Sequence, residues 1–217
     1  MRNKILLIIA SILVISGPSY AYDDGDFQIW NTEVQEKKIN ENTKVTLEEE
    51  FRWGDDASEF YYQHYDLGFH YSLEEHLVIG GGYRHIYEFK KGKFKEENEP
   101  YLIASWLWSF NKAKLEDRSR LEYRHFDYQA DAWRYRNKFT VKLPFKFTSL
   151  EIQPYLADEI FLDFQNKAFS RNRFYSGLMM SLTKNLKAEI YYLLQSSKSS
   201  NNWIDANVLG SKLKLAF

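Results

Sequence analysis

The chain of 217 residues carries 29 Lys and Arg and 30 Asp and Glu, so its formal net charge is −1 and no global basic field exists to gather nucleic-acid phosphates. It contains no cysteine, which excludes a lipid-anchored lipoprotein, disulfides and thiolate metal sites. Aromatic residues make up 18% and charged residues 27% of the chain, a composition that fits a soluble β protein or a barrel whose apolar residues all face one way.

The first residues have the pattern of an export signal. Arg2 and Lys4 supply positive charge before the apolar run 5–15. Positions 19–21 read Ser-Tyr-Ala, a small-x-small cleavage motif. The apolar run is too short to span a bilayer comfortably as a permanent helix, although an uncleaved anchor is the alternative. We therefore predict a cleaved signal peptide at 1–21 and one exported domain at 22–217. Export is a second argument against a nucleic-acid partner.

The remainder of the chain alternates apolar and polar residues with a period of two, and no segment has a convincing helical stripe. In 133–143 the odd positions are apolar with the exception of Asn137, and every even position is polar. Near the C-terminus, Leu213 alternates with Lys212 in the same way. Eleven segments follow this pattern and are predicted strands: 26–37, 43–53, 60–72, 77–89, 98–110, 113–127, 131–143, 147–162, 170–182, 186–196 and 203–217.

The connections between these segments are expected to alternate in length. Short turns are predicted at 38–42, 72–76, 110–113, 144–147 and 183–185, and longer polar loops at 54–59, 90–98, 127–132, 163–170 and 196–202. Alternation of tight turns and longer loops is typical of an outer-membrane barrel whose short turns face the periplasm. Strands of about a dozen residues can cross a bilayer at a tilt.

These features predict an all-β fold, an antiparallel transmembrane β-barrel of about 10–12 strands located in the cell outer membrane. Bacterial single-chain barrels normally have an even number of strands, so we expect 10 or 12 strands instead of 11. Segment 26–37 would start outside although the chain enters from the periplasm, so it is expected to be split, partly inside the lumen or miscounted. Three acidic residues, Glu49, Asp117 and Asp158, fall on faces that should be apolar.

Five tryptophans lie near predicted strand ends. Trp53, Trp133 and Trp203 border the long loops, and Trp106 and Trp108 lie just before a short turn. This placement predicts two aromatic girdles, one at each membrane–water interface. The alternative is ordinary core aromatics in a β-sandwich.

In a membrane barrel the polar face of each strand points inward, which would fill the lumen with charge. Mixed charges of this kind can pair and plug a small lumen, and guanidinium suits the purpose because its planar fork grips carboxylates with two hydrogen bonds. The alternative is an anion- or solute-selective constriction. By parity the charged residues that face the lumen are Glu48, Glu50, Arg52, Asp66, Arg84, Glu88, Glu116, Arg118, Arg120, Glu122, Arg124, Arg134, Arg136, Glu151, Glu159, Arg171, Arg173 and Glu189.

The C-terminal stretch NVLGSKLKLAF ends on Phe217, with apolar residues at alternate positions before it. It resembles the signal by which the barrel assembly machinery recognises its clients, so that machinery and outer-membrane lipid are the expected partners. The stretches DFQIWN, LEEEFRWGD, LEYRHFDYQ and WRYRNKF resemble a Gram-negative family catalogued as domain of unknown function 2490. The resemblance covers essentially the whole predicted mature chain; it implies an outer-membrane location and brings no catalytic residues.

Histidines are the candidate catalytic residues. His64 shares an inward face with Asp66, and the triplet Tyr83–His85 (Tyr-Arg-His) recurs as Tyr123–His125. The chain has no nucleophile elbow, and spacing alone cannot align a base with a nucleophile. A metal site at His64 and His70 is disfavoured because six residues along a strand separate them by about 20 Å. We therefore name no catalytic residue, cofactor-binding residue, metal ligand or cofactor.

The glycine triplet 80–82 is not followed by the Lys-Ser/Thr of a phosphate loop and is interpreted as relief of crowding or a bend in a strand. Together the sequence favours a structural or binding barrel with a charged, largely plugged lumen. Three alternatives stay open: a narrow ion- or solute-selective channel, an outer-membrane lipid-modifying enzyme, and a soluble periplasmic lipocalin-like binding protein. The sequence leaves the oligomeric state open.

Overall fold

The computed structural model describes residues 24–165, 168–199 and 202–217. The predicted signal peptide at 1–21 lies outside the described residues. Within them the chain is all β, as predicted from the alternation of apolar and polar residues. No helix in the described ranges has the length and apolar character needed to cross a membrane.

Eleven strands correspond one to one with the eleven predicted segments. They are β1 (Asp26–Lys38), β2 (Thr43–Gly54), β3 (Glu59–Glu74), β4 (Leu77–Lys90), β5 (Lys93–Phe110), β6 (Ala113–Phe126), β7 (Ala132–Lys142), β8 (Gln153–Asp163), β9 (Ala168–Ser181), β10 (Leu186–Ser199) and β11 (Asn202–Ala216).

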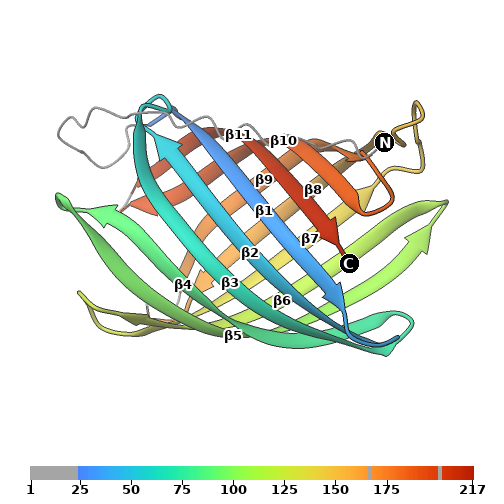
Figure 1. Cartoon of the computed structure of the whole chain (residues 1–217). Coiled ribbons are helices and arrows are strands. Elements are labelled where there is room, and N and C mark those ends of the chain that lie inside the picture. The colour runs from blue at the N-terminus through green and yellow to red at the C-terminus, as the bar shows by residue number, and fades with distance from the viewer. Residues whose placement is uncertain (1–23, 166–167, 200–201) are drawn as a thin grey trace, which may run out of the picture.

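The strands form one closed barrel in which each strand pairs with its sequence neighbours and β1 pairs with β11 (Figure 1). All sequential pairs are antiparallel, and the closing β1–β11 pair is parallel, with a continuous register from Asp26 opposite Ala206 to Glu36 opposite Ala216. Closure matters because it leaves no sheet edge with unpaired backbone groups.

The expectation of an even strand number was wrong, whereas the predicted range of about 10–12 is confirmed. Segment 26–37 is neither split nor placed in the lumen: it is the complete wall strand β1. An odd number of strands makes the first and last strands run in the same direction, so the barrel closes through a parallel pair. A mitochondrial barrel of 19 strands shows that an odd number is possible in membrane barrels.

The odd-numbered strands begin at one end of the barrel, which we call the loop end. They finish at the opposite end, which we call the turn end. The predicted alternation of short turns and longer loops is wrong, because the connections at both ends are two to five residues long except for 143–152. At the loop end β4 and β5 are joined by Lys91 and Gly92 alone, both with positive φ, so most of the predicted loop 90–98 is strand. At the turn end, 143–152 is the longest connection between the described strands, although a short turn was predicted there. Polar composition misled the prediction because inward-facing strand residues in this barrel are polar too.

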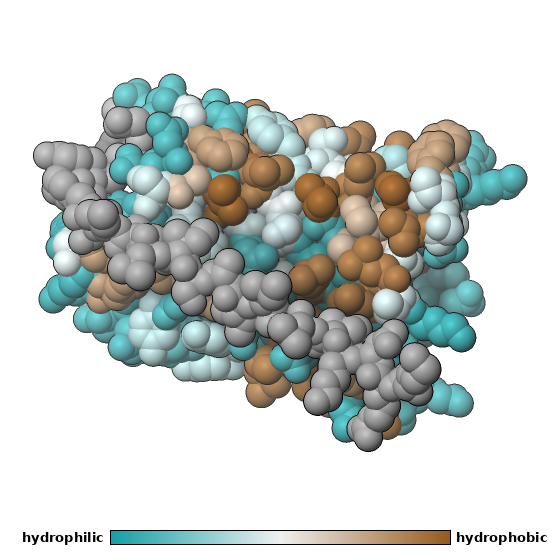
Figure 2. Space-filling view, turned by 45° about the horizontal axis from the view of Figure 1, so that its top comes forward, coloured by the Kyte–Doolittle hydropathy of each residue, from teal (hydrophilic) through white to brown (hydrophobic). Residues whose placement is uncertain are grey.

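The side chains are inverted relative to a soluble protein. Large apolar residues are exposed on the outer wall: Leu102 is 67% exposed and Leu67 is 56% exposed. Arginines, glutamates and tyrosines are buried inside. Figure 2 shows hydrophobic side chains gathered on the barrel wall and hydrophilic ones toward its two ends. This arrangement is the one that a lipid solvent favours, because lipid offers no penalty to exposed apolar groups.

The three acidic residues on the apolar face do point outward. Asn137 Nδ2 donates a hydrogen bond of 2.5 Å to Asp117 Oδ1, and Asn172 Nδ2 donates one of 2.9 Å to Asp158 Oδ1. Neighbouring amides therefore satisfy part of the hydrogen-bonding capacity of these two carboxylates. Glu49 instead lies opposite Glu33 across β1 and β2.

The glycine triplet relieves crowding, as interpreted from the sequence. A Cβ atom on Gly82 would collide with the Tyr101 hydroxyl group and with the backbone carbonyl oxygen of Leu67. The same device recurs on the other side of the barrel, where a Cβ on Gly210 would collide with the Tyr191 ring. Missing side chains at these points make room for large aromatic rings inside the lumen.

Candidate functional site

The barrel encloses a cavity of about 970 Å³ lined by inward side chains from all eleven strands. The lining contains 19 Lys and Arg side chains but only 12 Asp and Glu side chains, and Glu122 is fully buried against the same arginines as a thirteenth carboxylate. The whole chain has a net charge of −1. The interior is therefore positively charged although the protein as a whole is not.

A continuous circuit of side-chain contacts runs around the lumen near the middle of the barrel; we call it the interior ring. Each neighbouring pair along it is joined by an ion pair, a hydrogen bond or a cation–π contact. Its members, in order, are Asp66, Arg120, Glu122, Arg136, Glu159, Arg173, Trp30, Arg52, Glu50, His64, Glu48 and Arg84.

Asp66 of β3 joins strands that are not neighbours. Arg84 Nε donates to Asp66 Oδ2 at 2.9 Å, and Arg120 Nη2 of β6 reaches the same oxygen atom at 3.0 Å. The second carboxylate oxygen accepts a 2.6 Å hydrogen bond from the Tyr101 hydroxyl. Because the Arg120 side chain passes β4 and β5 to reach β3, this contact cuts across the lumen instead of following its wall.

Glu122 and Glu159 continue the interior ring through the next strands. Arg136 of β7 donates from Nη1 to Glu122 at 2.9 Å and from Nη2 to Glu159 at 2.8 Å, so one guanidinium bridges β6 and β8. Arg134 also donates to Glu122. Glu159 in turn lies 3.7 Å from Arg173 of β9. Both carboxylates are almost completely buried, and their pairing with several guanidinium groups offsets the cost of that burial.

Trp30 closes the interior ring on the side where ion pairs are absent. Its indole ring lies between two guanidinium groups, with the Arg52 carbon 3.7 Å and the Arg173 carbon 4.8 Å from the ring centre. Arg52 then pairs with Glu50 at 2.5 Å. Trp30 belongs to β1 and Arg173 to β9, so this contact also spans the lumen across intervening strands.

His64 completes the circuit. Its Nε2 lies 3.3 Å from Glu48 and its Nδ1 lies 3.1 Å from the Tyr62 hydroxyl and 3.8 Å from Glu50. His70 does not join it: that ring contacts Thr46 at 3.2 Å. Among the described residues no group of three or more His, Asp and Glu side chains is arranged to hold a metal ion.

An apolar cluster covers the lumen wall under β1 and β8–β11. It contributes large rings, among them Tyr175 and Tyr191, whose centres are 5.6 Å apart, and Met179 packs against it. The lumen is thus asymmetric, with most of the ion pairs on one wall and aromatic surface on the other. The buried members of the cluster are Trp30, Tyr155, Ala157, Tyr175, Tyr191, Leu193 and Val208.

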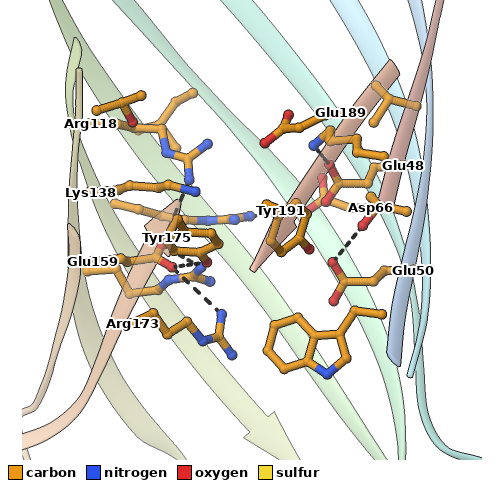
Figure 3. A pocket seen from close by; sticks show the side chains of 18 of the residues that line it. Glu48, Glu50, Asp66, Arg118, Lys138, Glu159, Arg173, Tyr175, Glu189 and Tyr191 are labelled. Atoms are coloured by element: carbon orange, nitrogen blue, oxygen red, sulfur yellow. Dashed lines mark hydrogen bonds and ion pairs between the residues drawn. The ribbon is translucent and has the colours of Figure 1, made fainter. Parts of the chain in front are cut away.

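Between the interior ring and the turn end lies a region rich in cations, which we call the cationic vestibule. Figure 3 shows Arg118 and Lys138 on one wall and Glu48 and Glu189 on the opposite wall of the cavity. Lys212 bonds Glu48 at 2.9 Å, whereas the Lys138 ammonium lies 3.6 Å from the centre of the Tyr175 ring. The cations of the vestibule are Lys44, Lys114, Arg118, Lys138, Lys142, Lys187, Lys212 and Lys214.

The structure places seventeen of the eighteen predicted lumen-facing charges on the inner face of a strand. Sixteen of these seventeen line the cavity, and Glu122 is buried behind it. The exception is Glu151, which also lines the cavity but does so from the connection 143–152, where it pairs with Lys146 at 3.1 Å. Strand β8 begins only at Gln153, because a turn with positive φ at Thr148 and Glu151 precedes it.

Sequence reasoning missed two buried carboxylates, Glu97 and Glu99. Arg124 Nε donates to Glu97 at 2.5 Å, and Arg134 donates to Glu99. Glu97 fell in a predicted loop, so its parity was not considered. The signal was present, since both residues share parity with Tyr101, which also points inward.

The five predicted girdle tryptophans all lie on the outer face. At the loop end each of three tryptophans contacts another aromatic ring: Trp53 contacts Phe60 at 5.5 Å, Trp133 contacts Tyr123 at 5.1 Å and Trp203 contacts Phe169 at 5.4 Å. Near the turn end Trp106 is 52% exposed, and Trp108 lies 5.9 Å from Phe139. The C-terminal Phe217 is exposed, and its backbone N–H donates to Glu36 O at 2.9 Å.

The tyrosines and histidines of the two repeated triplets form a polar cluster on the outer face near the loop end, whereas the arginine between them in each triplet points into the lumen. His125 Nδ1 lies 2.9 Å from Asp131 Oδ1, and the Tyr123 hydroxyl donates to Asp131 Oδ2 at 2.6 Å. These hydrogen bonds, first that from Tyr123 and then that from His125, lower the pKa of Asp131 below its usual value. Next to them His85 Nδ1 lies 2.7 Å from Asn98 Oδ1, and Asn98 is the cross-strand partner of His125.

Comparison with known proteins places the chain in one family. Residues 27–206 match the model of a family described as "Protein of unknown function (DUF2490)". The match covers most of the barrel, so the chain belongs to this family, in agreement with the resemblance seen in its sequence. A search of curated proteins found no match.

Proposed function

We propose that this DUF2490 protein is an outer-membrane β-barrel that binds a ligand in its lumen and does not act as an open pore. The interior ring is the observation that carries the proposal. Its side chains meet in pairs around and across the lumen, so a solute would have to break buried ion pairs to pass. Breaking a buried pair is expensive, on the order of 3–5 kcal/mol, because it leaves an uncompensated charge.

The outer face supports the membrane part of the proposal. Exposed leucines and phenylalanines cover the wall, and tryptophans lie near both ends, where the headgroups of a bilayer would be. A soluble lipocalin-like protein would bury these groups inside and place its charges outside. In this barrel the charges are inside, which favours the membrane protein over that alternative.

Fractionation and conductance test the proposal together. Residues 22–217 should be recovered from the outer-membrane fraction as a heat-modifiable band, and the refolded barrel in a planar bilayer should give no large steady current. Recovery as a soluble monomer without detergent would refute the membrane location. A steady current typical of a general porin would refute the closed lumen, whereas small anion-selective events would favour the narrow channel.

A second candidate function is lipid modification at the outer face. The observation that favours it is the hydrogen-bonded group of His125, Asp131 and Tyr123, which lies where lipid headgroups would meet the wall. A carboxylate that orients an imidazole is the usual support for a general base. Against this candidate, no Ser or Cys is hydrogen-bonded to the imidazole of His125 among the described residues, so water would have to be the nucleophile.

A further inference from the structure

Three cross-strand pairs inside the cationic vestibule bring two cations face to face. Arg118 is the direct partner of Lys138 across β6 and β7, and Lys114 is the partner of Lys142 on the same two strands. Lys187 is the partner of Lys214 across β10 and β11. Like charges directly opposite one another destabilise a sheet, because their Cβ atoms are only about 5 Å apart.

Carboxylates of the protein do not neutralise all these cations. Lys214 and Lys44 share Glu36, and Lys212 uses Glu48. By contrast, within the described residues no carboxylate oxygen lies within 4 Å of Lys114, Lys138, Lys142 or Lys187.

Arg118 has a weak partner. Its nearest carboxylate is Glu159 at 3.8 Å, and that carboxylate already receives hydrogen bonds from Arg136 and from the Tyr175 hydroxyl. Arg118 also keeps 36% of its side chain exposed to the cavity. Its guanidinium is therefore available to a further anion.

We propose that the cationic vestibule binds a phosphate group between Arg118 and Lys138, with Lys212 on the facing wall as a third cation; this inference rests on the proposed ligand-binding function. A phosphate monoester carries a charge of about −1.5 to −2 near neutral pH, which matches the two facing cations better than one carboxylate does. The guanidinium supplies two parallel donors and the ammonium a compact point charge.

The surroundings define the rest of the ligand. The Tyr175 ring lies under Lys138, and Tyr191 and Met179 extend this apolar surface along the wall. The lumen cavity of about 970 Å³ is lined by residues from both ends of the barrel, and the cationic vestibule is its part on the turn-end side of the interior ring. A phosphorylated small molecule or the headgroup of a phospholipid would fit this combination, and both present the same phosphate chemistry.

Isothermal titration calorimetry on refolded residues 22–217 in a neutral maltoside detergent tests the site. The probes are inorganic phosphate and dihexanoyl phosphatidic acid, each against a chloride solution of matched ionic strength. The variants are Arg118→Gln and Lys138→Gln. The matched control is Lys95→Gln, which removes one cation near the loop end, where Lys95 faces Tyr128 at 5.4 Å.

We expect saturable binding that weakens roughly 10- to 100-fold in each vestibule variant, the loss typical of one charge-assisted hydrogen bond, and is unchanged in Lys95→Gln. Binding of both probes identifies the phosphate group as the ligand, and binding of phosphatidic acid alone identifies a lipid source. Equal weakening in all three variants would overturn the site, because it would reflect only the total charge.

The melting temperature is a second measurement, which shows whether a variant that binds no phosphate is still folded. In the absence of phosphate, Lys138→Gln should melt at or above the wild-type temperature because it removes a like-charge pair, and phosphate should raise the melting temperature of the wild type only. No phosphate effect on a folded, non-conducting wild-type barrel would overturn this inference and leave the proposed function standing. A porin-like current would overturn the proposed function itself.

Discussion

The guanidinium carbon of Arg52 lies 3.7 Å from the centre of the Trp30 ring, at the one place where the interior ring passes from ion pairs to aromatic surface. Trp30 is 2% exposed and also faces Arg173. The other five tryptophans are on the outer wall, so Trp30 is the one tryptophan of the six whose side chain faces the lumen.

Replacing Trp30 with Ala should therefore loosen both the fold and the lumen. The loss of a buried indole costs about 3–5 kcal/mol of unfolding free energy, and the space left between Arg52 and Arg173 opens the interior ring. Denaturant titration in detergent and single-channel recording measure the two effects. Trp203→Ala, on the outer face, is the control and should leave the conductance unchanged. An unaltered conductance in Trp30→Ala would show that the closure lies elsewhere.

Arg136→Ala should destabilise the barrel by about 3–5 kcal/mol, since it leaves Glu122 and Glu159 buried without their shared partner. The unfolding free energy in urea measures the effect. The matched control is Glu151→Gln, which breaks the exposed pair with Lys146. A solvent-exposed ion pair contributes about 0–1 kcal/mol, so the control should be nearly neutral. Similar costs for the two variants would contradict the assignment of the buried network.

The facing of the strands gives a third prediction. Leu213 and Phe139 are on the outer wall, and arginine at either position should be destabilising, with roughly 2–4 kcal/mol as the upper value that a site at the bilayer midplane would give. Lys212→Leu and Lys138→Leu should cost far less, apart from the lost contacts of those lysines inside. Unfolding in phospholipid vesicles measures the difference. Equal costs for the two classes would show that the barrel wall does not face lipid.

Much of the wall could be predicted because a period of two is a local property of the chain. All eleven strands were located from alternation alone, and the inward charges followed from parity. The closure was not predictable in this way: the parallel pairing of β1 with β11 depends on chain ends that are far apart in sequence. The strand that was predicted to start at residue 147 starts only at Gln153, because the turn before β8 depends on positive φ at residues without a glycine signal.

The contacts within the interior ring could not be predicted from sequence. Parity shows that Asp66 and Arg120 both point inward, but it does not show that Arg120 reaches past two strands to meet Asp66 at 3.0 Å. That contact depends on the curvature of the closed barrel and on the length of the arginine side chain. The proposed phosphate site could not be predicted from sequence either, because it depends on the strand register that places Arg118 opposite Lys138.

The odd strand number makes a prediction about topology. The first described strand starts at the loop end and β11 finishes at the turn end, so the two ends of the barrel chain lie on opposite sides. If the turn end faces the periplasm, an epitope inserted between Asp56 and Ala57 should bind antibody on intact cells. The same epitope between Asn111 and Lys112 should bind only after the outer membrane is permeabilised. The reverse pattern would invert the proposed orientation and would put the cationic vestibule outside the cell.

The last prediction concerns the outer-face cluster near the loop end. If the protein modifies lipids, His125→Ala should abolish release of acyl chains or headgroups from outer-membrane lipids, because it removes the imidazole that Asp131 orients. Asp131→Asn should reduce the rate while keeping the hydrogen bond from Tyr123. His85→Ala is the matched control, since its partner is the neutral Asn98. Thin-layer chromatography of lipids incubated with each folded variant gives the readout. We expect no turnover by the wild type, because no activated nucleophile accompanies the imidazole. Turnover by the wild type that is lost in His125→Ala but kept in His85→Ala would show that the protein is an enzyme and would contradict the proposed binding function.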